Sequence, residues 1–191
     1  MLTADPKNIN IYLESNPNPN SLKFVVNEVL VPDGMSFDFA DPEKAAEAPL
    51  AQELFMYPFV DRVFYASNFV TVTKKADVEW AEIQHLLKDH IRQFLESGKL
   101  ILDTKTPETT EGEDTEIIQK VKSILDEYIR PAVEQDGGAI SFHSLSDGIL
   151  KVALQGSCSG CPSSTITLKA GIENLFKRMM PDDVKSVEAL G

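Results

Sequence analysis

Short apolar runs alternate with polar residues through the first hundred positions, and their spacing predicts strands. Four runs rich in β-branched and aromatic residues are typical of strands: 9–14, 21–26, 60–65 and 69–73. Residues 66–68, Ala-Ser-Asn, separate the last two runs, which predicts a hairpin between them. The first half of the chain is therefore expected to contain a largely antiparallel sheet.

Two helices are expected in the same half. Residues 45–55 predict a short helix with Pro49 in an early turn. Asp77 is the expected cap of a longer helix, and Gly98 is expected to end it. Its apolar stripe recurs at helical spacing and consists of Trp80, Ile83, Leu87, Ile91 and Phe94.

The second half begins with another amphipathic pattern, from about Thr115. Pro131 is expected to kink or end this helix, and the pair Gly137-Gly138 to terminate it. The apolar positions follow the helical period and are Ile117, Val121, Ile124 and Tyr128.

Two strands, a helix and a final strand are expected to follow. Ser146-Asp147-Gly148 is a strong hairpin signal between strands at 139–145 and 149–155. A helix is expected from Pro162 until the break at residues 181–183, and a strand at 184–190. The order in this half is α-β-β-α-β.

A polar stretch separates the two halves. Residues 103–116 contain no apolar residue and are rich in Thr and Glu, which predicts an acidic, solvated linker. We therefore expect an α+β protein of two small α+β domains, residues 1–102 and 117–191, joined by the linker 103–116.

Charge narrows the range of partners. The 191 residues include 18 Lys and Arg against 30 Asp and Glu, a net charge of −12. Such a chain repels phosphate backbones and anionic lipid, so neither nucleic acid nor a membrane is an expected partner.

The apolar runs are far shorter than the roughly 20 residues that span a bilayer. Residues 1–8 resemble neither a secretory signal nor a mitochondrial presequence, so the chain is expected to be cytoplasmic or an already processed form.

The two cysteines, Cys158 and Cys161, form a Cys-x-x-Cys pair and carry the candidate chemistry. Both lie before the helix expected at Pro162, whose positive end favours thiolates. Gly156 and Gly160 allow a tight bend with amide groups free to bond sulfur. We expect this loop to lie outside the apolar stripes that form the core.

The number of thiols limits what the pair can hold. An iron–sulfur cluster or a structural zinc ion commonly takes four protein ligands, and one chain offers two thiolates. The chain's histidines, His85, His90 and His143, are not expected to complete the set. Water, small thiols or the pair of a second chain would complete it, and the last of these makes a symmetric dimer.

Spacing alone leaves several chemistries open: an iron–sulfur or zinc site, thiol–disulfide redox work, or an incidental pair. A thioredoxin-like redox pair follows the first strand of a βαβ unit, whereas this pair follows a β-hairpin. That context weakens the redox alternative without removing it, and a zinc-bridged structural dimer also stays open.

Two longer sequences resemble known modules. Residues 129–138, Ile-Arg-Pro-Ala-Val-Glu-Gln-Asp-Gly-Gly, and residues 154–173, Leu-Gln-Gly-Ser-Cys-Ser-Gly-Cys-Pro-Ser-Ser-Thr-Ile-Thr-Leu-Lys-Ala-Gly-Ile-Glu, resemble the C-terminal NifU domain. Residues 16–24, Asn-Pro-Asn-Pro-Asn-Ser-Leu-Lys-Phe, and residues 69–74, Phe-Val-Thr-Val-Thr-Lys, resemble the N-terminal domain of Nfu-type proteins. The two resemblances together cover most of the chain.

The resemblance implies a non-enzymatic iron–sulfur cluster assembly and carrier protein. Its Cys158 and Cys161 match the positions that bind iron in the family, where a [4Fe–4S] cluster is bridged between the two chains of a homodimer. A [2Fe–2S] form is the alternative. The expected partners are an upstream assembly scaffold that donates the cluster and apo iron–sulfur proteins that receive it.

Overall fold

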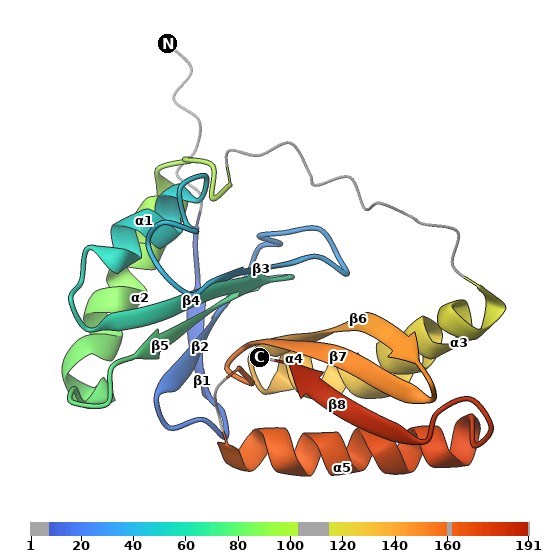
Figure 1. Cartoon of the computed structure of the whole chain (residues 1–191). Helices are drawn as coiled ribbons and strands as arrows, with labels where there is room; N and C mark the ends of the chain where they lie inside the picture. The colour runs from blue at the N-terminus through green and yellow to red at the C-terminus, as the bar shows by residue number, and fades with distance from the viewer. Residues whose placement is uncertain (1–7, 103–114, 160–161, 191) are drawn as a thin grey trace. The chain divides into compact units, whose positions relative to one another are not determined.

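The computed structural model describes residues 8–102, 115–159 and 162–190, and these divide into two compact units (Figure 1). The first unit holds the elements from β1 to α2, and the second holds those from α3 to β8. Each unit combines helices with its own sheet, which confirms the expected α+β class. Among the described residues, no helix is both long enough and apolar enough to cross a membrane.

The first unit is built on a five-stranded antiparallel sheet with the strand order β1-β2-β5-β4-β3. Strands β4 and β5 form the expected hairpin, and Ser67 turns the chain with a φ of 45°. The strands of this sheet are β1 (Ile11–Ser15), β2 (Ser21–Val26), β3 (Ser36–Phe39), β4 (Val60–Ala66) and β5 (Phe69–Lys74).

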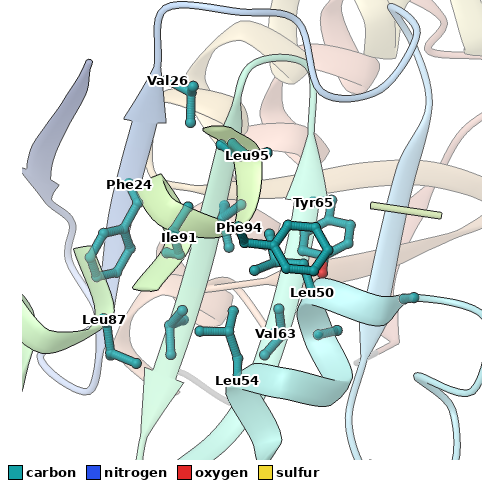
Figure 2. Packing of buried hydrophobic residues seen from close by; sticks show 14 of the residues in the cluster. Phe24, Val26, Leu50, Leu54, Val63, Tyr65, Leu87, Ile91, Phe94 and Leu95 are labelled. Carbon is teal, nitrogen blue, oxygen red and sulfur yellow. The ribbon is translucent and has the colours of Figure 1, made fainter. Parts of the chain in front are cut away.

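Two helices, α1 (Pro49–Phe55) and α2 (Trp80–Glu96), bury their apolar sides against alternate residues of this sheet. In Figure 2 the side chains from both helices meet those of β2 and β4. The labelled core residues are all buried: Phe24, Val26, Leu50, Leu54, Val63, Tyr65, Leu87, Ile91, Phe94 and Leu95. Burying each large apolar side chain contributes about 1.5–3 kcal/mol to the stability of the folded state, so the packing of these helices on the sheet stabilises the first unit.

Three local expectations for this unit are wrong. The long helix begins after Glu79 rather than at Asp77, and the short helix begins at Pro49 rather than at residue 45. Strand β3 has no counterpart among the expected strands. Four residues are too few for a period to be visible, and its Asp38 is stabilised by an ion pair with Arg62 at 2.6 Å, from the neighbouring strand.

The second unit follows the expected α-β-β-α-β order. Its sheet has the strand order β6-β7-β8, antiparallel between β6 and β7 and parallel between β7 and β8. Alternate residues of β7 are buried, so its helices share one face of the sheet. The elements are α3 (Glu116–Ile124), a π-helical turn η1 (Leu125–Ile129), α4 (Arg130–Gln135), β6 (Gly138–Ser146), β7 (Ile149–Gly156), α5 (Pro162–Met179) and β8 (Ser186–Leu190).

The first helical stretch runs through Pro131 instead of ending there. At η1 the backbone N–H of Arg130 donates to the carbonyl of Leu125, five residues back, which widens the helix just before the proline. A regular turn would press the proline ring against the carbonyl four residues earlier, and the wider turn avoids that clash. The helix therefore continues through α4 and ends at Gly137, which has a φ of 76°.

Candidate functional site

The loop after β7 carries Cys158, the one cysteine that lies in the described part of the chain. Gly156 turns the chain out of the strand with a φ of 65°, and the N–H of Ser159 donates to its carbonyl at 3.1 Å. Cys161 lies outside the described residues, so the structure leaves the predicted pairing of the two thiols as a prediction.

Cys158 is buried, with 3% of its surface exposed, and it packs in the same hydrophobic cluster as Val133 and Leu154. The expectation that this loop lies outside the core is wrong for this residue. A thiol is a small, weakly polar group that packs readily among apolar side chains. The apolar stripes on which the expectation rested did not include cysteine.

The turn between α4 and β6 holds this loop from one side. The hydroxyl of Ser157 donates a hydrogen bond to the carbonyl of Asp136, and the N–H of Ser157 donates to the carbonyl of Gly137 at 3.3 Å. Both acceptors lie at the end of a helix, where the last carbonyls have no partner within the helix itself. Ser157 therefore fastens the cysteine loop to the helix end through two neighbouring carbonyls.

Gly138 provides the space that the sulfur occupies. A Cβ at this position would lie 2.9 Å from the Sγ of Cys158 and 2.5 Å from the carbonyl oxygen of Gln155. Contacts below 3.0 Å are essentially absent between real Cβ atoms and their neighbours. The double glycine thus has two roles: Gly137 supplies the left-handed turn and Gly138 supplies room for the thiol.

The histidines have other surroundings. His143 is exposed on β6 and its ring forms a hydrogen bond with the hydroxyl of Ser144. His143 lies five residues along the strand from Gly138, which separates these two residues by about 17 Å. In the first unit, His90 lies 2.9 Å from the Tyr57 hydroxyl and 3.0 Å from Glu53. Within residues 8–102, 115–159 and 162–190, no three His, Cys, Asp or Glu side chains form a group that could hold a metal ion.

The electrostatics around His90 stabilise the first unit. A hydrogen bond from Lys99, at 2.9 Å, lowers the pKa of Glu53, with His90 acting in the same direction and partial burial opposing both. This carboxylate joins α1 to α2 and the segment that follows it. The arrangement is a surface ion-pair group that fits a structural role.

Comparison with known proteins identifies the family of this chain. Residues 11–98 match the family described as "Scaffold protein Nfu/NifU N terminal", and residues 121–188 match "NifU-like domain". The human protein named "NFU1 iron-sulfur cluster scaffold homolog, mitochondrial" is 39% identical over 181 residues, which cover 93% of this chain and 70% of that protein. The chain belongs to the Nfu family of iron–sulfur cluster scaffold proteins.

Other Nfu proteins extend beyond the length of this chain. A Drosophila ananassae protein of the same printed name is 40% identical, and the match covers 95% of this chain but 64% of that protein. A solution NMR structure of a NifU-like protein from Saccharomyces cerevisiae matches 51% of this chain and 87% of its own at 26% identity, with a TM-score of 0.46. By its family the Nfu chain is a scaffold and not an enzyme.

Sequence reasoning found the cysteines of this Nfu protein but missed the residues that surround the first of them. Ser157 and the carbonyl of Asp136 meet only after folding, because they lie 21 residues apart in the sequence. The sequence predicts that the double glycine ends the helix, which describes Gly137 but not Gly138. A register counted from the Ser146–Ile149 pair would place Gly138 opposite Ser157, and the irregularity between Phe142 and Ser144 shifts the pairing to Gly156. The sequence therefore carried no local signal for this role.

Proposed function

We propose that this chain binds a [4Fe–4S] cluster between two copies of itself, through Cys158 and Cys161 of each copy, and transfers it to apo-proteins. The observation that carries the proposal is the cradle at Gly138, which leaves room for the sulfur of Cys158 in a chain of the iron–sulfur scaffold family. Thiolates are the ligands that iron–sulfur clusters take, commonly four of them.

The number of ligands supports the bridged arrangement. The full sequence contains two cysteines, and none of the described histidines or carboxylates joins Cys158 in a ligand group. Two copies supply four thiolates, and a cluster shared in this way lies on the twofold axis of the dimer. We therefore propose a homodimer whose association depends on its cargo.

The same arrangement suits transfer. A cluster held by two thiolates from each of two chains can be taken up by an acceptor in steps, one ligand exchange at a time. Proteins that keep a cluster permanently for electron transfer usually provide all four ligands from a single chain and enclose it. The proposed cargo is accordingly a substrate to be passed on, received from an upstream scaffold and delivered to apo iron–sulfur proteins.

The two units have different parts in this proposal. Both thiols belong to the second unit, whereas the first contains no cysteine. We propose that the second unit binds the cluster and that the first recognises the donor or the acceptors. The expected domain bounds, 1–102 and 117–191, stay predictions, and so does the cytoplasmic location. The human and Drosophila ananassae relatives are named as mitochondrial proteins.

Anaerobic reconstitution of the full chain with iron and sulfide tests the proposal. A brown protein with equal amounts of iron and sulfide is expected, and its visible spectrum distinguishes a [4Fe–4S] from a [2Fe–2S] cluster. A colourless protein that retains zinc would instead support a zinc-bridged dimer. A colourless, metal-free protein that reduces disulfide substrates would support a thiol–disulfide oxidoreductase.

A further inference from the structure

Ser157 stands immediately before Cys158 and is itself 2% exposed. A buried hydroxyl in this position requires a partner, and it has one in the carbonyl of Asp136 at the end of α4. The adjacent N–H bonds the next carbonyl, that of Gly137. Side chain and backbone of one residue thus both attach to a single helix end.

This attachment acts on Cys158 because the two residues are adjacent in the chain. With Ser157 fixed at two points, the Cα of Cys158 cannot move far from Gly138, beside which its sulfur lies. The Ser157 oxygen is 3.9 Å from Cys158 Sγ, within the range of a weak hydrogen bond to sulfur. The helix end, the serine and the glycine cradle together fix the position of the sulfur.

The helix end is fixed in turn by the fold of the second unit. Asp136 and Gly137 donate their N–H groups to Ala132 and Glu134, which continues the helical pattern into the turn. Val133 anchors this last segment in the core, 1% exposed. The carbonyls that receive Ser157 therefore lie in a turn that is hydrogen-bonded to the end of α4.

We propose that Ser157 is a positioning residue for Cys158, and that its hydroxyl determines how firmly this thiolate is held and how quickly the cluster is lost. The inference rests on the proposed function for its second half only. Groups that orient a metal ligand without touching the metal commonly change metal affinity by about 10–100-fold when they are removed. Ser157→Ala removes the hydroxyl and leaves the backbone bond to Gly137 in place.

The first test measures the thiol itself in the metal-free full chain. In a Cys161→Ser background, Cys158 is alkylated with iodoacetamide under native conditions, with and without Ser157→Ala. Loss of this buried hydrogen bond is expected to raise the alkylation rate about 10-fold, since the loop opens more often. Ser157→Thr keeps the hydroxyl and is expected to return the rate toward that of the parent.

Two control variants separate positioning from general stability. Ser123→Ala removes a serine hydroxyl that also donates to a backbone carbonyl, that of Gln119 at 3.0 Å, on α3 of the same unit. Gly148→Ala strains the turn between β6 and β7, where the glycine has a φ of 79°, at the far end of the hairpin from Gly138. Neither is expected to raise the alkylation rate beyond what its own unfolding midpoint explains.

The second test measures the cargo. Reconstituted protein without the Cys161→Ser change is mixed with excess iron chelator, and the decay of visible absorbance is followed. Ser157→Ala is expected to lose its cluster about 10-fold faster than the parent and Ser123→Ala. If the parent forms no cluster at all, the proposed function fails, while the alkylation test still decides the positioning role.

Three results would overturn the positioning role. One is a Ser157→Ala alkylation rate equal to that of Ser123→Ala. Another is an increase in the alkylation rate of Ser157→Ala that is no larger than the increase for Gly148→Ala, when the two variants have the same unfolding midpoint. The third is a failure of Ser157→Thr to restore the rate, which would assign the effect to volume rather than to the hydroxyl.

Discussion

Replacing Gly138 by alanine adds one methyl group at the position where the cysteine loop and the double glycine meet. The new Cβ would lie 2.5 Å from the carbonyl oxygen of Gln155, 2.9 Å from Cys158 Sγ and 3.3 Å from Cys158 Cβ. The nearest of these atoms belongs to the backbone of a paired strand, so rotation of a side chain cannot relieve the contact. Either β6 and β7 separate locally or the cysteine loop moves outward.

The size of the effect follows from two opposing contributions. Forcing one extra methyl group into a packed site costs about 1–3 kcal/mol. Loss of the glycine's freedom in the unfolded chain offsets about 0.4–1 kcal/mol of that. Taking the middle of each range, the second unit should lose about 1.3 kcal/mol of unfolding free energy, which for a domain of this size lowers its melting temperature by about 5–10 °C.

Circular dichroism of the full chain during heating measures the change, and Gly171→Ala is the matched control. Gly171 lies within α5, and a Cβ there would meet nothing within 4 Å. Alanine is favoured over glycine inside a helix by about 1 kcal/mol, so this control should be neutral or more stable. The fluorescence of Trp80, the only tryptophan in the chain, reports the first unit and should be unaffected in both variants.

The reasoning is refuted if Gly138→Ala melts with the parent protein and its Cys158 reacts with iodoacetamide at the parent rate. That result would mean that the turn absorbs a methyl group without displacing the sulfur.

Replacement of either cysteine by serine is expected to abolish cluster binding, because a hydroxyl stays protonated near neutral pH and is a poor iron ligand; iron and sulfide analysis of each reconstituted variant checks this, and retention of cluster by one of them would contradict the ligand assignment. Cys158→Ser should also cost about 1–3 kcal/mol of stability, measured by urea unfolding, because it buries a hydroxyl among apolar side chains. Glu53→Gln should destabilise the first unit at pH 7 by less than about 1 kcal/mol, since the ion pair with Lys99 is partly exposed. The pKa of Glu53 is lowered by folding, so this contribution is present above its ordinary value of 4.5 and is lost as the pH falls below it; urea unfolding followed by Trp80 fluorescence should give the same midpoint for both proteins at low pH, and a difference that persists there would refute the assignment.

Elements with a strong local signal were predictable from the sequence. Strand β2 begins and ends at the expected residues, 21 and 26, where Leu22, Phe24 and Val26 alternate with Ser21 and Lys23. The hairpin at Ser146-Asp147-Gly148 forms as expected, since Asp147 and Gly148 both have positive φ, which is what a two-residue hairpin turn requires. The helix α3 begins directly after its cap Thr115, near the expected start, and the Thr115 hydroxyl accepts a hydrogen bond from the N–H of Ile118.

Features that depend on contacts between distant residues were not predictable in the same way. A proline in a helical pattern normally indicates an end, and only the widened turn at η1 lets the helix pass Pro131. The burial of Cys158 results from packing against α4 and β7, which a local pattern does not contain. The hydrogen bond from the Ser157 hydroxyl to the Asp136 carbonyl likewise joins two turns, and neither turn contains a local sequence signal for this contact.

The central claim is that the cluster joins two copies of this chain, and the mass of the protein with and without its cargo tests it most directly. Light scattering on anaerobically reconstituted protein, without added small thiols, is combined with iron analysis before and after chelation. The account predicts a dimer with about four iron atoms per two chains, and a shift toward monomer when the iron is removed. A loaded protein that remains a monomer would contradict it.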